Sequence, residues 1–178
     1  EILRKHAKEI MQLVSPDDLV ELGSGSSTKT RILIEAMHST GCHRYSPLDI
    51  SETALQEAVD ALTADYDWLE VNGQLGDFDT DLPKLQRKGK RLVAFLSSNI
   101  CNHNLVSNTE RAEFLTKLGG IMEKGDALLL GVGLMKDIPI LLGAYNDSKG
   151  LNGKFTLSAL DIINTISMLT FLKQILNM

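Results

Sequence analysis

The sequence holds little of what several classes of protein require. Two cysteines, Cys42 and Cys101, are too few for a disulfide framework and stand at no metal-binding spacing. Their scarcity excludes a disulfide-stapled secreted scaffold and favours a reducing compartment, so we predict a cytoplasmic protein. No apolar run is long enough to span a bilayer, and residues 1–10 carry charges where a signal peptide has an apolar segment. We therefore expect no membrane partner.

Basic tracts, internal repeats and low-complexity segments are also missing. Lysine and arginine number 18 against 23 aspartates and glutamates, which gives a net charge of −5 and a pI near 5.3. A protein that binds nucleic acid needs a basic surface, so nucleic acid is not an expected partner. The sequence does have 178 residues, of which 43% are hydrophobic, and this is enough for the core of one globular domain.

Short apolar segments alternate with segments of helical period along the chain. The segments expected to form strands are 19–22, 43–51, 68–78, 91–99 and 126–133, of which the second and third include the loop that follows the strand. The segments expected to form helices are 1–14, 27–38, 51–66, 108–122 and 135–147. A serine or threonine is the candidate N-cap of the second helix, and Asn108 that of the fourth. Apolar strands separated by helices indicate a doubly wound α/β fold, with a mostly parallel sheet covered on both faces.

The alternating pattern assigns residues 1–150 to one Rossmann-like core. Residues 151–178 are predicted to form a helical tail, and its apolar character offers a surface for self-association or a connection to a partner domain. The first residue is not methionine, and the helical period is already established there. We therefore expect the natural chain to begin earlier.

A glycine-serine turn, "ELGSGSS", follows the first expected strand. In doubly wound sheets, ligands bind beyond the carboxyl ends of the strands, so this turn is the first place to look for a site. Gly23 and Gly25 would let the backbone approach a ligand closely, and the amides at the start of the next helix could face an anion.

Two nucleotide-binding loops explain this turn incompletely. "GSGSSTKT" approaches the phosphate-loop pattern, with Lys29 and Thr30 as its lysine and magnesium ligand, but Thr28 replaces the second glycine. The phosphate loop also needs an apolar strand that ends in aspartate, and the later strands end in serine or glycine. A dinucleotide loop expects glycine where Thr28 stands.

A loop for S-adenosylmethionine accounts for more of the sequence. Such a site needs an acid after the second strand for the ribose hydroxyls, and "SPLDIS" supplies Asp49. It needs an acid and an apolar side chain after the third strand for the adenine, and "LGDFD" supplies Asp77 and Phe78. Lys29 could reach the carboxylate of the cofactor. Three loops at three successive strand ends agree, which is more specific than one glycine motif.

The segments "LVELGSGSSTKTRILIEAM", "YSPLDIS", "LGDFDTDLPKL" and "LLGAYNDSKG" occur in an order that resembles the histidine-specific methyltransferase family. Its best-known member trimethylates the α-amino group of L-histidine on the way to ergothioneine. The resemblance implies a class I methyltransferase fold, S-adenosyl-L-methionine as cofactor and an amino acid, L-histidine as the first expectation, as the small-molecule substrate. It covers residues 17 to about 165.

The same resemblance implies roles for individual residues. Gly23, Ser24 and Lys29 would contact the amino-acid end of the cofactor, while Asp49, Asp77 and Phe78 would bind its ribose and adenine. Asn102, after the fourth strand, would bind the carboxylate and amine of the substrate, and Tyr145 of "AYND" would also contact the substrate. Together, Asn102 and Tyr145 would orient a neutral amine for in-line attack on the methyl group. No metal is implied.

The chain departs from the family pattern at several positions. Ser97 and Cys101 stand where the family has glycines, and Gly133 stands where it has an aspartate. The separate substrate-binding domain and the last two strands of the usual sheet are also expected to be missing. An alternative hypothesis is therefore a truncated or diverged paralogue without catalytic activity, which binds the cofactor weakly or serves as a partner subunit.

Overall fold

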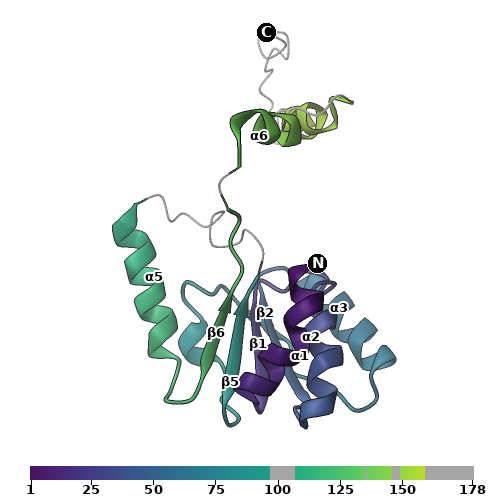
Figure 1. The fold of residues 1–178 in the computed structure, drawn as a ribbon, viewed down its shortest axis with the longest axis vertical. Helices are drawn as coiled ribbons and strands as arrows, with labels where there is room; N and C mark the ends of the chain where they lie inside the picture. The colour runs from purple at the N-terminus through teal and green to yellow at the C-terminus, as the bar shows by residue number, and fades with distance from the viewer. Residues whose placement is uncertain (97–106, 135, 146–148, 159–178) are drawn as a thin grey trace. The chain divides into compact units, whose positions relative to one another are not determined.

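The fold was analysed in a computed structural model, which describes residues 1–96, 107–134, 136–145 and 149–158 (Figure 1). Three residues singled out from the sequence, Ser97, Cys101 and Asn102, lie outside the described residues. Contacts divide the chain into two units, Glu1–Gly133 and Leu134–Met178, and each is described by itself.

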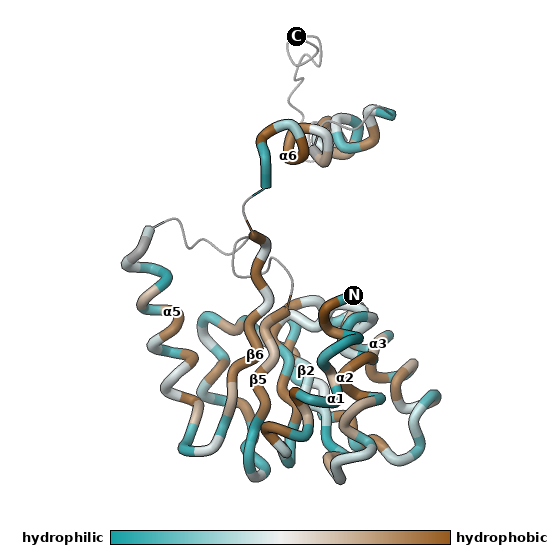
Figure 2. The backbone as a smooth tube through the Cα atoms, viewed as in Figure 1, coloured by the Kyte–Doolittle hydropathy of each residue, from teal (hydrophilic) through white to brown (hydrophobic). Residues whose placement is uncertain are grey.

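A parallel sheet forms the centre of the first unit. Its strands are β1 (Asp18–Leu22), β2 (Arg44–Asp49), β3 (Glu70–Val71), β4 (Gln74–Leu75), β5 (Arg91–Phe95) and β6 (Ala127–Leu130). Their order is β3-β2-β1-β5-β6, with β4 also paired to β2, and every pairing is parallel. All residues of β1, β2 and β5 are buried, as expected for strands covered on both faces. The β5 and β6 strands are hydrophobic along most of their length (Figure 2).

Helices cover both faces of this sheet, which confirms the doubly wound fold. One face carries α1 (Ile2–Val14), α2 (Arg31–Met37) and α3 (Glu52–Asp65), and the other carries α5 (Asn108–Gly120) (Figure 1). Successive strand residues point to opposite faces. Leu19 therefore joins the core beneath α1 and α2, whereas Val20 joins the core beneath α5. Two short 3-10 helices, η1 (His38–Thr40) and η2 (Leu82–Lys84), complete the described elements of this unit.

The third expected strand is present as two short pieces. Both β3 and β4 pair with β2, and Asn72 and Gly73 interrupt them. A Cβ atom at Gly73 would lie 2.8 Å from Cγ2 of Val59 on α3, so the close approach of this helix requires glycine there. The expected strand and its loop therefore lie within residues 68–78, with the strand divided into β3 and β4.

The helix after the glycine turn begins later than predicted. It was expected from residue 27, but α2 starts at Arg31. Thr30 is its N-cap residue, yet the Thr30 side chain makes no hydrogen bond to a helix amide. Its hydroxyl instead donates to the buried Glu21 carboxylate at 2.5 Å. A tertiary contact has replaced the local cap.

The α5 helix is capped by Ser107, and the prediction of Asn108 was wrong by one residue. The Ser107 hydroxyl accepts a hydrogen bond from the Glu110 amide at 3.2 Å. In return, the Glu110 carboxylate accepts one from the Ser107 amide at 2.8 Å. This reciprocal pair is a capping box, which satisfies two backbone donors that the helix itself leaves unpaired.

We expect Ser107→Ala to lower the free energy of unfolding by about 1 kcal/mol, the usual cost of losing a serine N-cap. Urea denaturation followed by circular dichroism would measure the change. Thr116→Ala is the matched control, because it removes a hydroxyl from the middle of the same helix, where that group bonds only to the Ala112 carbonyl in the described structure. Equal losses in the two variants would contradict the capping role.

The second unit contains the short helix α6 (Ile138–Tyr145), and residues 151–158 are also helical. Pro139 lies in the first turn of α6, where its missing N–H breaks no helical hydrogen bond. Ile138, Ile140 and Leu142 expose more than half of their surface. Within the described parts of the chain, no helix is long and apolar enough to cross a membrane.

Candidate cofactor site

The turn between β1 and α2 has the backbone conformation that its glycines predict. Gly23 has φ 70° and Gly25 has φ 49°, both in the left-handed region that side chains disfavour. The Gly23 amide donates to the Leu48 carbonyl at 2.8 Å, which continues the pairing of β1 with β2 into the turn. A Cβ atom at Gly25 would have no described atom within 4 Å, so conformation rather than crowding requires glycine there.

A hollow of about 280 Å³ lies beside this turn. Its lining residues are Glu21, Gly23, Ser24, Gly25, Ser26, Thr28, Lys29, Thr30 and Leu96. The Ser24 hydroxyl is buried and has no hydrogen-bond partner among the described residues. A buried polar group of this kind is normally satisfied by water or by a ligand, so the hollow presents a polar atom suited to binding.

Asp49 ties the turn to the second strand. One of its carboxylate oxygens accepts the Gly25 amide at 2.7 Å, and the other accepts the Ser51 amide at 2.9 Å. The sequence placed Asp49 at the carboxyl end of the second strand, and the structure has it there, as the last residue of β2. Each oxygen keeps a further lone pair, so the carboxylate can still accept from a ligand hydroxyl.

Asp77 and Phe78 follow β4 at the same edge of the sheet. The Gly76 amide donates to the Asp49 carbonyl at 3.0 Å, which brings this loop next to Asp49. Asp77 accepts the Asp79 amide at 2.8 Å. Phe78 packs edge-on against Phe95, with ring centroids 5.4 Å apart. Phe78 therefore contributes to the core at the end of the sheet as well as to the loop.

A buried polar network lies beneath the turn. The Glu21 carboxylate accepts hydrogen bonds from the hydroxyls of Thr30 and Tyr45, and Tyr45 also bonds to Ser27 at 2.8 Å. Burial raises the pKa of Glu21 to about 7, against the opposing effect of the two hydroxyl donors. Sequence reasoning missed Ser27 and Tyr45. The available signal was a tyrosine within the second expected strand and a run of hydroxyl-bearing residues in the turn.

The geometry does not favour the phosphate-loop alternative. The Thr30 hydroxyl, which that alternative assigns to magnesium, is buried and directed at Glu21. Among the described residues, no group of three or more histidine, cysteine, aspartate or glutamate side chains could hold a metal ion.

The predicted residues are only partly brought together. Gly23, Ser24, Gly25 and Lys29 line one hollow, and Asp49 is bonded to its wall. Tyr145 ends α6 in the second unit, where its backbone alone is described, and Asn102 lies outside the described residues. The predicted substrate contacts therefore stay predictions.

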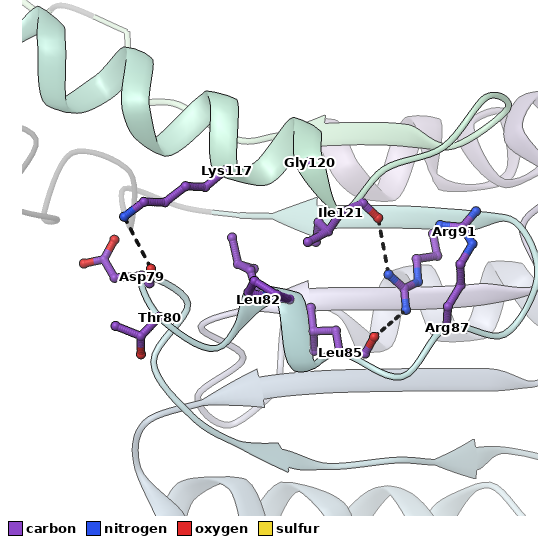
Figure 3. A pocket seen from close by; sticks show the side chains of 10 residues that line it. Asp79, Thr80, Leu82, Leu85, Arg87, Arg91, Lys117, Gly120 and Ile121 are labelled. Atoms are coloured by element: carbon purple, nitrogen blue, oxygen red, sulfur yellow. Dashed lines mark hydrogen bonds between the residues drawn. The ribbon is translucent and has the colours of Figure 1, made fainter.

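A larger hollow, of about 470 Å³, lies between η2 and α5 (Figure 3). Its inner end is formed by Arg91, whose guanidinium donates to the Leu85 carbonyl at 3.0 Å and the Ile121 carbonyl at 3.4 Å (Figure 3). Arg91 begins β5, so this end lies at the amino edge of the sheet. Because its cation is directed at one carbonyl oxygen that follows η2 and one that follows α5, we assign Arg91 a structural role.

The family model described as "Histidine-specific methyltransferase, SAM-dependent" matches residues 1–174. The chain belongs to this family. Histidine N-alpha-methyltransferase of Mycobacterium tuberculosis is 41% identical over 165 residues, which are 92% of this chain and 50% of that protein. Ergothioneine biosynthesis protein 1 of Neurospora crassa is 30% identical over 93% of this chain and 19% of its own length. The chain thus spans half or less of the length of these two relatives.

A solved structure supports the fold of this histidine-specific methyltransferase family member. The SAH-bound methyltransferase of Podospora anserina matches with a TM-score of 0.53 and 13% identity, over 90% of this chain and 69% of that one. At this identity the likeness concerns the fold alone. It agrees with the parallel, Rossmann-like sheet of class I methyltransferases. S-adenosylmethionine is the cofactor of the family.

Proposed function

We propose that this chain carries the cofactor-binding core of an N-methyltransferase that acts on the α-amino group of an amino acid, with L-histidine as the substrate. The observation that carries the proposal is the hydrogen bond from the Gly25 amide to Asp49, which joins two loops predicted to hold one cofactor. The names of two relatives, which specify histidine methylation and ergothioneine biosynthesis, supply the substrate and the pathway.

The residues present fit S-adenosylmethionine. The unpartnered Ser24 hydroxyl and the Lys29 cation line the same hollow and suit the carboxylate of the cofactor. Asp49 would accept the ribose hydroxyls, and Asp77 with Phe78 would hold the adenine. We assign this binding to residues 1–150, and residues 151–178 to a helical segment that leads toward a substrate domain.

When bound, the cofactor supplies a methyl group activated by its sulfonium. The chain itself has to place the substrate amine in line with that group, because positioning provides most of the acceleration in such a transfer. The amine must be neutral to attack, so its proton leaves to water. We propose that Asn102 and Tyr145 hold the carboxylate and amine region of the substrate.

Mass spectrometry of L-histidine incubated with the protein and S-adenosylmethionine tests this proposal. We expect mono-, di- or trimethylated histidine, and no product from the Asp49→Ala variant or from histidine whose α-amino group is acetylated. Binding of S-adenosylhomocysteine without any product, from histidine or from a panel of other amino acids, would contradict the proposed catalysis. That result would support the alternative of a non-catalytic cofactor-binding chain.

A further inference from the structure

Three hydroxyl groups and one carboxylate form a buried chain that links the cofactor turn to the centre of the sheet. Ser27 belongs to the turn, Tyr45 to β2, Glu21 to β1, and Thr30 to the start of α2. All four residues expose 4% of their surface or less. Buried polar groups are stable only when hydrogen-bonded, so these contacts depend on one another.

The direction of each hydrogen bond follows from counting hydrogens. An ionised carboxylate only accepts, so both Thr30 and Tyr45 donate to Glu21. The Tyr45 hydroxyl has one hydrogen, which it donates to Glu21 in a hydrogen bond. Ser27 must therefore donate its own hydrogen to Tyr45, at 2.8 Å. The chain runs from the turn into the sheet and ends on the carboxylate.

Ser27 needs such support because of its backbone. Its φ is 51°, in the left-handed region that residues with a side chain rarely adopt. Its amide donates to the Ser24 carbonyl at 2.9 Å, and its carbonyl accepts the Arg31 amide at 3.1 Å. Ser27 thus closes the turn that presents Ser24 and Gly25 to the hollow and joins that turn to α2.

We propose that Tyr45 is a positioning residue of the cofactor site. Through its hydrogen bond to Ser27 it holds the turn in its left-handed shape, and it is itself fixed by Glu21. Tyr45 is absent from the described residues that line the hollow, so it would act on the cofactor through the turn alone. This inference rests on the proposed cofactor site and extends it to a residue inside the sheet.

The protonation state of Glu21 sets the direction of the hydrogen bonds in this buried chain. When the carboxyl group is protonated it must donate to one hydroxyl, and donation to Tyr45 would reverse the bond between Tyr45 and Ser27. The charged groups that act on Glu21 are Asp49, which favours protonation, and Lys29, which opposes it. The contact between Tyr45 and Ser27 is kept in either direction, so the direction given above holds at a pH above the pKa of Glu21, which is about 7.

Calorimetric titration of S-adenosylhomocysteine into the purified protein at pH 8 tests the proposal. We expect Tyr45→Phe and Ser27→Ala each to weaken binding by about tenfold, the effect of losing one hydrogen bond of this kind. The double variant should bind no more weakly than the weaker single variant, because both remove the same contact. Tyr66→Phe is the matched control, since the exposed Tyr66 hydroxyl bonds Glu35 at 3.4 Å, and its affinity should equal that of the wild type.

A further readout separates positioning from general stability. Amide hydrogen exchange of residues 23–28 in the free protein should be faster in Tyr45→Phe than in the wild type. Unchanged affinity in Tyr45→Phe, or a lower Tm without faster exchange in the turn, would overturn the proposal. If the wild-type protein does not bind S-adenosylhomocysteine, the proposed cofactor site itself is overturned. Amide exchange of residues 23–28 would still decide whether Tyr45 holds the turn in its shape.

Discussion

Asp49→Ala should weaken the binding of S-adenosylhomocysteine by roughly 100-fold or more. The substitution removes the acceptor of the Gly25 amide and the acceptor of the Ser51 amide. Under the proposed function it also removes the acceptor of the two ribose hydroxyls. Hydrogen bonds to a charged group contribute about 1.5–3 kcal/mol each, so the loss of the two made by the ribose hydroxyls accounts for this factor. Isothermal titration calorimetry measures it directly.

Asp60→Ala is the control for the loss of one negative charge. Asp60 lies on α3, and its exposed carboxylate bonds to Gln56 at 2.8 Å. This variant should bind S-adenosylhomocysteine as the wild type does. If the Asp49 and Asp60 variants bind S-adenosylhomocysteine equally well, the loop after β2 that begins at Asp49 does not take part in the site.

Glu21→Gln should flatten the pH dependence of stability between about pH 4.5 and 7. The pKa of Glu21 is raised by burial from 4.5 to about 7. A raised folded-state pKa gives a contribution to stability that is fully present below pH 4.5 and is lost as the pH rises to about 7. At 1.36 kcal/mol per unit, this loss is roughly 3 kcal/mol in the wild type.

Urea denaturation of both proteins at a series of pH values provides the measurement. The buried Asp18 also has a raised pKa because of burial, so the wild-type profile alone mixes two groups. The difference between the wild type and Glu21→Gln isolates Glu21. Glu57→Gln, at an exposed position on α3, should leave the profile unchanged. Parallel profiles for the wild type and Glu21→Gln would contradict a raised pKa at Glu21.

The cofactor turn shows how far local sequence reaches. Gly23 and Gly25 could be placed in a tight turn after a buried strand, and both have the left-handed φ that favours glycine. Asp49 could be placed beside them because the carboxyl ends of parallel strands meet at one edge of a sheet. Both predictions depend only on the order and spacing of residues along the chain.

The helix boundaries show where local sequence falls short. Thr30 has the chemistry of an N-cap, yet its hydroxyl bonds to Glu21, nine positions earlier in the chain. Between β3 and β4, a Cβ atom at residue 73 would lie 2.8 Å from Val59 on α3, so the close approach of the helix favours glycine there. Both features depend on a partner distant in sequence.

The sequence by itself determined the parallel α/β class, the glycine turn after β1, the acid at the end of β2 and the family. These follow from the apolar period of the strands and from short motifs. Only the tertiary structure determined the chain of hydrogen bonds that runs from Ser27 through Tyr45 to Glu21. Ser27 and Tyr45 are separated by 18 positions, and Tyr45 and Glu21 by 24. They meet only because β1 pairs with β2 in the register that sets Leu19 opposite Tyr45, and no local preference encodes that register.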